Sequence, residues 1–296
     1  MYEIIIVGGS YAGLSAAMAL GRSRRNVLVI DSGKPCNASA IQSHNFLTQD
    51  GESPSVIASV GKAQVLAYPT ITFTEDLVVS TTGGDGNFQI GCASGKSYFS
   101  NKLIFAAGVK DLLPVTPGFK ECWGKSIIHC PYCHGYEYLD QPTGILANGE
   151  VAFSFGQLIH NWTNKLTIFT NGPSLINKEN TLKLGSLGVS IVTDEIVKFD
   201  HEDGHLNRVL LNNGISYSLN TFYARVPFEQ HCSGILEIGC KLTDEGFVQV
   251  DELSKTNIPG IYAAGDCTTL FRSLAGAVAS GSKAGAMVNH EIIVQS

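Results

Sequence analysis

Residues 3–13 have the sequence Glu-Ile-Ile-Ile-Val-Gly-Gly-Ser-Tyr-Ala-Gly. The first part, residues 3–7, predicts a buried parallel strand, and the small residues after it predict a tight turn into a helix that begins near Leu14. Gly8 allows the turn, and Gly13 allows the helix to pack closely against the strand. The N-terminus of such a helix presents backbone amides that suit a pyrophosphate group.

An acidic residue follows the next predicted strand. Residues 27–30 (Val-Leu-Val-Ile) are apolar, and Asp31 comes directly after them. In a dinucleotide-binding unit, an acid at this place accepts a hydrogen bond from a ribose hydroxyl. Ser10 stands where the fingerprint has its middle glycine, and its small side chain still allows close approach of a phosphate. Strand, turn, helix, strand and acid together predict a dinucleotide-binding unit.

A degraded copy of this pattern lies further along the chain. A strand over residues 144–146 leads into Ala-Asn-Gly-Glu-Val-Ala at 147–152, then into a helix and a strand over 166–169. Ala147 replaces the first glycine, and its methyl group would crowd the turn. Thr170 replaces the acid. The chain is therefore expected to hold two nucleotide-binding units.

The predicted fold class is α/β, with two Rossmann-like three-layer (ββα) nucleotide-binding domains, the second inserted in the first. A buried strand at 103–108 indicates the end of the first domain's N-terminal part. A second buried strand, at 260–266, belongs to the part of that domain which follows the insertion. The expected bounds are 1–112 and 228–296 for the first domain and 113–227 for the inserted one.

The composition excludes several classes of protein. The chain has 296 residues, 44% of them hydrophobic and 16% charged, which is too apolar for a disordered chain and too weakly charged for a coiled coil. A net charge of −6 argues against a nucleic-acid binder. No run approaches the roughly 18 apolar residues of a membrane span, and the first residues lack the basic region of a signal peptide. We expect a soluble, cytoplasmic protein without nucleic-acid or membrane partners.

The only closely spaced cysteine pair is Cys130-Pro131-Tyr132-Cys133, among eight cysteines. A Cys-x-x-Cys pair at a helix start lowers the pKa of one thiol and gives an attacking thiolate near neutrality. His134 is placed to take or give the proton, although a packing role stays open. His129 and His44 are weaker candidates, more typical of structural or supporting residues. No second Cys/His pair at ligand spacing follows, so we predict no metal site.

The order of these motifs resembles that of the low-molecular-weight thioredoxin reductases. The resemblance is carried by the fingerprint at 8–13, by Ala106-Ala107-Gly108, by the inserted unit with its Cys-x-x-Cys, and by Gly265-Asp266, and it covers essentially the whole chain. It implies an FAD-binding domain split by a pyridine-nucleotide-type domain, a homodimer, and a redox disulfide that faces the flavin.

The resemblance also implies roles for individual residues. Cys133 would lie against the flavin and form the charge-transfer thiolate, Cys130 would exchange with the substrate, and His134 would complete the catalytic set. The residues implied to bind the cofactor are Gly8, Ser10, Tyr11, Ala12, Gly13, Asp31, Asn45, Ala107, Gly108, Gly265, Asp266, Leu274 and Ala275.

Two features depart from the ordinary reductases. The stretch after the second fingerprint, residues 170–174, carries no Arg for the 2′-phosphate of NADPH. His134 stands where those reductases have Asp. The sequence Cys-Pro-Tyr-Cys-His-Gly at 130–135 is similar instead to that of the gliotoxin- and holomycin-type dithiol oxidases, which oxidise a dithiol and pass the electrons through FAD to oxygen.

The sequence thus favours an FAD-dependent thiol–disulfide oxidoreductase, a dithiol oxidase not driven by NADPH. Its substrate would be a small-molecule dithiol or disulfide, or a thioredoxin-like protein. An NAD(P)H-dependent disulfide reductase stays open, because Gly149 and Ala152 survive in the second fingerprint. The intact pair Cys130/Cys133 argues against a flavin-binding module without turnover.

Overall fold

The computed structural model describes residues 1–295, which form two compact units. The split unit comprises Met1–Ala38, Asn45–Asp111 and residues 228–295, and the inserted unit comprises Leu112–Pro227. The short segment Ser39–His44 packs with the inserted unit, although it precedes that unit in the chain. Each unit is described by itself below.

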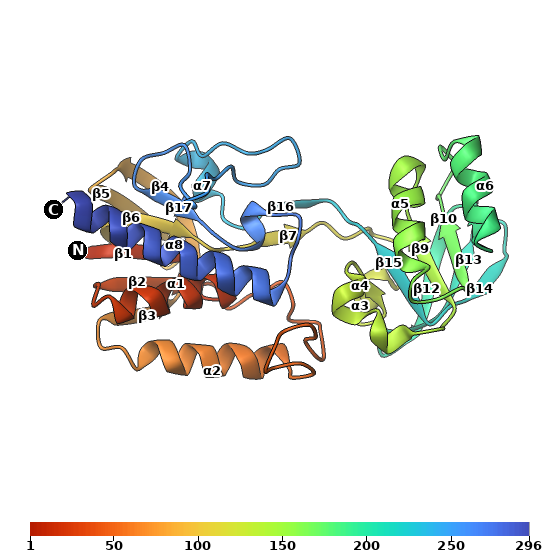
Figure 1. Cartoon of the computed structure of the whole chain (residues 1–296), viewed down its shortest axis with the longest axis horizontal. Coiled ribbons are helices and arrows are strands. Elements are labelled where there is room, and N and C mark those ends of the chain that lie inside the picture. The colour runs from red at the N-terminus through yellow and green to blue at the C-terminus, as the bar shows by residue number, and fades with distance from the viewer. Residues whose placement is uncertain (296) are drawn as a thin grey trace. The chain divides into compact units, whose positions relative to one another are not determined.

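The split unit is built on a seven-stranded sheet with helices on one face (Figure 1). The strands β3, β2, β1, β6 and β17 are parallel, and β4 and β5 continue from β6 in antiparallel pairing. The sheet strands are β1 (Tyr2–Val7), β2 (Val27–Asp31), β3 (Ile71–Glu75), β4 (Val78–Gly84), β5 (Asn87–Cys92), β6 (Ser97–Phe105) and β17 (Ile261–Ala263). The remaining elements are α1 (Tyr11–Arg22), α2 (Pro54–Leu66), the paired strands β7 (Val109–Asp111) and β16 (Phe228–Gln230), α7 (Gly234–Glu237), η2 (Asp266–Thr268) and α8 (Leu274–Gln295).

The first predicted strand is buried on both faces, as its continuous apolar run indicates. Ile4 and Ile6 pack toward α1 and α8, whereas Ile5 and Val7 pack toward β4, β5 and α7. This alternation follows from the two-residue period of a strand. The parallel part of the sheet is therefore covered by hydrophobic clusters on both faces.

Helices α1 and α8 run side by side across the sheet (Figure 1). A Cβ atom at Gly281 would lie 2.0 Å from the carbonyl oxygen of Ala12. The small residues of α8 therefore serve close packing of the two helices.

The inserted unit has a five-stranded parallel sheet in the order β11-β10-β9-β15-β8. These strands are β8 (Ile127–Ile128), β9 (Thr143–Leu146), β10 (Leu166–Phe169), β11 (Ser190–Val192) and β15 (Thr221–Ala224). An antiparallel sheet covers one face, with β12 (Ile196–Glu202), β13 (His205–Leu211) and β14 (Ser216–Ser218), and the helices are α3 (Phe119–Cys122), α4 (Pro131–His134), η1 (Tyr136–Tyr138), α5 (Gly149–Ile159) and α6 (Lys178–Ser186).

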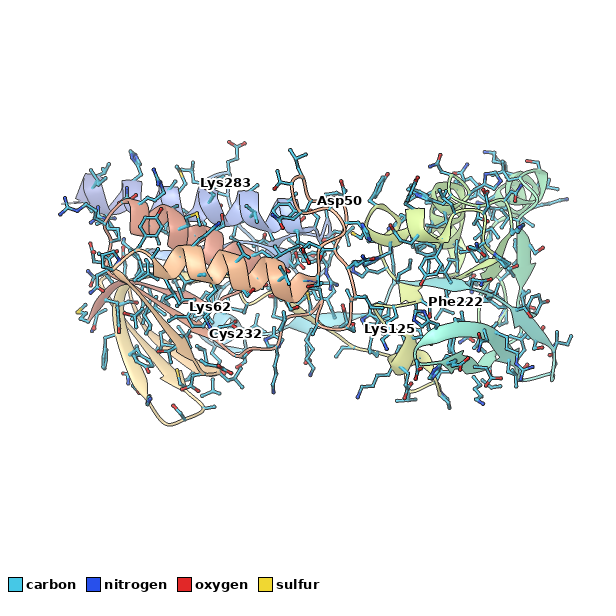
Figure 2. The ribbon with its side chains drawn as sticks, turned by 90° about the horizontal axis from the view of Figure 1, so that it is seen from below. Asp50, Lys62, Lys125, Phe222, Cys232 and Lys283 are labelled. Carbon is cyan, nitrogen blue, oxygen red and sulfur yellow. The ribbon has the colours of Figure 1, made fainter. Side chains whose placement is uncertain are left out.

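Two hydrophobic cores lie on opposite faces of this parallel sheet. Phe222, labelled in Figure 2, is fully buried and packs against Phe169 and Phe199 on the side of the antiparallel strands. Phe155 of α5 and Ile168 belong to the core on the helix side. The second unit thus repeats the three-layer plan, and the predicted fold class is confirmed.

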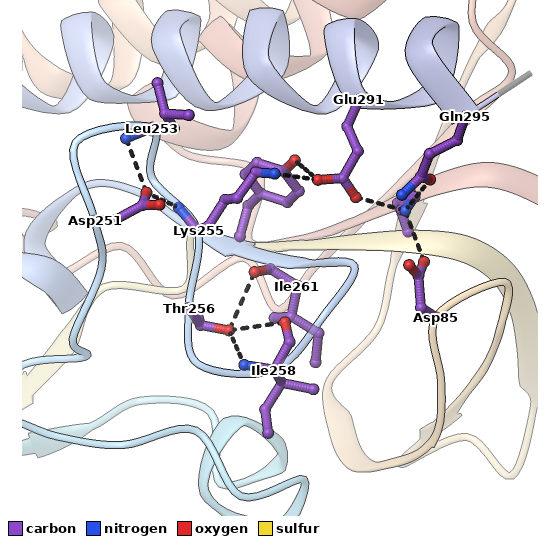
Figure 3. Close-up of polar contacts among 11 residues, drawn as sticks. Asp85, Asp251, Leu253, Lys255, Thr256, Ile258, Ile261, Glu291 and Gln295 are labelled. Carbon is purple, nitrogen blue, oxygen red and sulfur yellow. Dashed lines mark hydrogen bonds and ion pairs between the residues drawn. The ribbon is translucent and has the colours of Figure 1, made fainter.

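A charge cluster around the buried Lys102 joins the C-terminal helix to the sheet of the split unit (Figure 3). Lys102 on β6 is 3% exposed, and its ammonium group lies 2.6 Å from Glu291 and 2.7 Å from Asp85. Glu291 also pairs with Lys255 and accepts a hydrogen bond from the hydroxyl of Tyr262. Burial opposes ionisation of Glu291, but these hydrogen bonds prevail and lower its pKa to about 2.

Replacing Lys102 by methionine should lower the free energy of unfolding by about 3 kcal/mol, because Glu291 and Asp85 lose their shared cation. Chemical denaturation measures this change. Lys178→Met, at an exposed position, should change the free energy of unfolding by less than about 0.5 kcal/mol. Because the pKa of Glu291 is depressed, its stabilisation is present above its ordinary pKa and is lost as the pH falls toward 2. Wild-type stability in Lys102→Met would contradict this role for the cluster.

Among the helices of residues 1–295, none has the combined length and apolarity that crossing a membrane requires.

Candidate functional site

The first fingerprint forms a turn that only glycine can occupy at two positions. Gly8 has a φ of +103°, and a Cβ there would lie 2.4 Å from the carbonyl oxygen of Ala106. A Cβ at Gly13 would lie 1.8 Å from the carbonyl oxygen of Gly8. Ser10 precedes α1 without a side-chain capping bond. The first-turn amides of α1 are therefore not capped by Ser10 and suit a phosphate.

Asp31, at the end of β2, holds the same turn in place. One carboxylate oxygen accepts a hydrogen bond from the amide of Gly9 at 2.8 Å, and the other accepts from the amide of Gly33 at 3.2 Å. The sequence predicted only a ribose acceptor at this position. The structure adds a positioning task, and a carboxylate has acceptor capacity left for a ribose hydroxyl.

A second acidic group follows β17. Asp266 is largely buried, and burial raises its pKa. The guanidinium of Arg272 donates two hydrogen bonds to Asp111, at 2.8 and 3.1 Å, and its Nε lies 3.6 Å from Asp266. That Nε is buried and makes no hydrogen bond within residues 1–295. The thiol of Cys36 lies 3.9 Å from Asp266 as well.

Arg272 was missed by the sequence interpretation. The signal was present, because Arg272 is the only charged residue between Asp266 and Lys283. An isolated charge in a run of small and apolar residues is typical of a paired or ligand-binding group.

The predicted cofactor residues gather where parallel strands end. Asp31 ends β2, and three glycines come after the ends of β1, β6 and β17, namely Gly8, Gly108 and Gly265. The carboxyl ends of parallel strands share one edge of the sheet. At Gly108 the φ is +68°, and a Cβ would meet nothing within 4 Å, which leaves the backbone open to a ligand.

Other predicted residues lie beside this edge. The amide of Gly265 donates to the hydroxyl of Ser280 on α8, so this turn is tied to the helix that begins with Leu274 and Ala275. Asn45 lies in the loop between β2 and α2, where its backbone amide donates a hydrogen bond to the carboxylate of Asp50 at 2.7 Å. The uncapped helix, the open backbone and the unsatisfied Arg272 together fit a dinucleotide such as FAD.

The cysteine pair begins the short helix α4 of the inserted unit, directly after β8. Cys130 is the N-cap residue, and its carbonyl oxygen accepts hydrogen bonds from the amides of Cys133 and His134, both at 3.3 Å. Both cysteines are half-buried. Tyr132 packs edge-on against Trp162, with 5.5 Å between the ring centroids. The fold therefore presents the pair on a single helical turn.

The structure brings His44 and Glu137 to His134. The rings of His134 and His44 meet at right angles with 6.2 Å between centroids, and His44 lies 3.3 Å from the carboxylate of Glu137. Burial lowers the pKa of His134, while the charge of Glu137 raises it. His44, a weaker candidate in the sequence, is thus placed beside the catalytic candidate. His129 instead packs against Trp123, with 6.1 Å between centroids.

In the second fingerprint, the side chain of Asn148 bonds to the backbone of its own chain. The side-chain oxygen of Asn148 accepts hydrogen bonds from the amides of Gly149 at 2.8 Å and Leu175 at 2.7 Å. Its amide group donates to the carbonyl oxygen of Pro173 at 2.9 Å. Asn148 therefore caps the first amide of α5 and ties the start of this helix to the loop after β10.

Two further residues of this unit differ from what the dinucleotide pattern uses at these places. The hydroxyl of Thr170 donates to the carbonyl oxygen of Gly172 at 2.6 Å and so is held within its own loop. Glu150 places a negative charge in the first turn of α5. Such a charge repels a phosphate group.

A dinucleotide fingerprint together with a half-buried Cys-x-x-Cys on a second nucleotide-type unit defines a nucleotide-dependent thiol–disulfide oxidoreductase. Residues 2–281 match the family model described as pyridine nucleotide-disulphide oxidoreductase. The chain belongs to this family and is a flavoprotein enzyme of the thioredoxin reductase-like type that uses FAD.

Individual relatives span almost the whole chain. A thioredoxin reductase of Aspergillus oryzae, aclD, is 32% identical over 96% of this chain and 94% of its own length. The structure of an oxidoreductase from Agrobacterium tumefaciens is 34% identical, with a TM-score of 0.94 over 100% of this chain and 99% of that one. The structure of HlmI is 28% identical, with a TM-score of 0.93 over 99% of this chain and 93% of that one.

Proposed function

We propose that the protein is a dithiol oxidase that works through the Cys130/Cys133 pair and is not driven by NADPH. A substrate thiolate attacks Cys130 of the enzyme disulfide, and Cys133 leaves as a thiolate. The second substrate thiol attacks the mixed disulfide, so the substrate leaves as a disulfide and both enzyme cysteines are reduced. Bound FAD would supply the two-electron acceptor that lets Cys130 and Cys133 re-form their disulfide, and dioxygen with two protons would take up the electron pair as hydrogen peroxide.

His134 is proposed to accept the proton of the incoming thiol. Burial keeps its imidazole neutral at lower pH than an exposed histidine, and a neutral imidazole is the form that accepts a proton. Glu137, close to His44, supplies the negative charge that stabilises the imidazolium once it forms.

The proposal that NADPH does not drive the enzyme rests on the hydrogen bonds of the Asn148 side chain. Its bonds to Gly149, Leu175 and Pro173 take the place that a dinucleotide phosphate needs. A 2′-phosphate would also find no cation in residues 170–174, and would lose charge-assisted hydrogen bonds worth about 1.5–3 kcal/mol each.

The experiment is anaerobic mixing of the oxidised, FAD-loaded protein with NADPH, NADH or dithiothreitol, followed by flavin absorbance. Dithiothreitol should bleach the flavin, and neither nicotinamide should do so at a comparable rate. Rapid bleaching by NADPH would instead establish the NAD(P)H-dependent reductase, the alternative that the names of the reductase relatives favour.

A pair of variants isolates the contribution of Asn148. Asn148→Gly removes the side chain that fills the loop and should strengthen NADH binding, measured by calorimetry. Asn177→Gly removes the corresponding N-cap of α6, which costs a similar few tenths of a kcal/mol, and should leave NADH binding unchanged. Equal behaviour of the two variants would show that Asn148 does not exclude the nucleotide.

We propose that the FAD lies on the carboxyl edge of the split unit's sheet, against the thirteen residues named from the sequence and Arg272. We also propose a homodimer, which the family resemblance implies and which analytical ultracentrifugation tests.

Asp31→Ala should weaken FAD binding by roughly 10–100-fold, because it removes a charged acceptor and frees the Gly9 amide. The dissociation constant, measured by fluorescence titration of the apoprotein, tests this expectation. Asp244→Ala removes the same charge at an exposed position of the split unit and should leave FAD affinity unchanged. An unaltered affinity in Asp31→Ala would remove Asp31 from the cofactor site.

A further inference from the structure

A cavity of about 270 Å³ lies on the inserted unit, beside helix α5. Its walls come mainly from one face of α5, with Arg225 from the segment after β15; the lining residues are Glu150, Val151, Ser154, Phe155, Leu158 and Arg225. The lining is mostly apolar and includes two charged residues, Glu150 and Arg225. No step of the proposed oxidation uses this cavity.

Two aromatic rings connect the cavity to the redox pair within the same unit. Tyr223 on β15 pairs in register with Ile128 on β8, and Cys130 follows Ile128 by two residues. The ring of Tyr223 meets the cavity-lining ring of Phe155 edge-on, with 5.7 Å between centroids. Since residues in a strand advance about 3.3 Å each, Arg225 is roughly 7 Å beyond Tyr223 along the chain. Cys130 likewise lies two residues after Ile128, so Arg225 and Cys130 follow the same end of two neighbouring parallel strands.

The two charged residues of the lining, Glu150 and Arg225, differ in whether neighbouring groups already bond to them. The carboxylate of Glu150 accepts a hydrogen bond from the side-chain amide of Asn180 at 3.0 Å and is thereby held toward α6. The guanidinium of Arg225 lies over the ring of Phe155, 4.9 Å from its centroid, and forms no ion pair with a carboxylate in the described part of the chain. Stacking fixes the plane of the guanidinium while its N–H groups stay available. Arg225 can therefore receive an anion.

We propose that this cavity binds the tail of a small dithiol that carries a carboxylate, with the apolar chain against Val151, Phe155 and Leu158 and the carboxylate on Arg225. This inference rests on the proposed oxidase function and names a substrate class for it. A guanidinium recognises a planar carboxylate through two parallel hydrogen bonds, which a neutral amide cannot reproduce.

The test compares two dithiols that differ only in this group, dihydrolipoate and its neutral amide, dihydrolipoamide. The KM of the wild-type enzyme for dihydrolipoate should be roughly 10-fold lower than for the amide, with similar kcat. Arg225→Gln should abolish that difference and leave the rate with dithiothreitol unchanged. Lys178→Gln removes one positive charge from an exposed site elsewhere on the inserted unit and should preserve the difference.

A binding measurement separates this inference from the proposed function. Octanoate, which has no thiol, should raise the melting temperature of the wild-type protein, and it should not do so in Arg225→Gln. An equal KM for the two dithiols, or no stabilisation by octanoate, would overturn the carboxylate site while leaving the oxidase intact. If no dithiol reduces the flavin yet octanoate stabilises only the wild type, the oxidase fails and the anion site stands.

Discussion

Cys133→Ser and Cys130→Ser are each expected to slow dithiol oxidation by about 10³-fold or more, because neither variant can form the enzyme disulfide that accepts the electrons. Steady-state oxygen consumption with dithiothreitol measures the loss. FAD content should stay at the wild-type level, since the proposed cofactor residues belong to the split unit. Substantial turnover in either variant would mean that dithiols reduce the flavin directly.

The two cysteine variants should differ in their spectra. In the arrangement that the family resemblance implies, Cys130→Ser leaves Cys133 as a thiolate beside the oxidised flavin and should show a long-wavelength charge-transfer band, whereas Cys133→Ser should not. The reverse pattern would exchange the roles of the two sulfurs. Cys240→Ser is the matched control. Cys240 is buried in the split unit, outside the Cys-x-x-Cys pair, and a serine can retain its contact with Thr256. Its activity and spectrum should match those of the wild type.

The fold could be predicted because its decisive signals are local. A strand, a glycine turn and a helix require their residues at adjacent positions, and Gly8 and Gly13 are needed there for reasons of backbone space alone. The degraded copy at Ala147 and Thr170 was visible for the same reason. Such short-range patterns identify both nucleotide-type units and the inserted order of the chain.

The missed features depend on contacts between distant residues. Asn148 lies inside the degraded fingerprint, and its hydrogen bond with the amide of Leu175, 27 residues away, is visible only in the folded chain. Similarly, the hydrogen bonds that Arg272 donates to Asp111 join residues 161 positions apart, so no local pattern indicates them. His44 reaches His134 because its short segment packs with the inserted unit, an arrangement that no local pattern indicates.

His134→Ala is expected to slow the reduction of the enzyme disulfide by dithiothreitol by roughly 10²–10⁴-fold, the range for loss of a positioned general base. Anaerobic stopped-flow absorbance isolates this half-reaction. Raising the pH should partly rescue the variant, because more of the substrate is then already thiolate. His134→Asp, which restores the residue of ordinary reductases, should retain part of the activity if its carboxyl pKa is raised by burial.

The pH profile distinguishes a proton acceptor from a packing residue. Because burial lowers the pKa of His134, the wild-type rate should hold below the ordinary histidine pKa of 6.5 and fall only at lower pH, as the imidazole becomes protonated. Glu137→Gln removes a negative charge that raises the pKa of His134, so this acid limb should shift further toward low pH. A merely structural His134 predicts no such shift, and His134→Ala would then keep wild-type rates across the whole range. The direction of the Glu137→Gln shift therefore decides whether the proton passes through this imidazole.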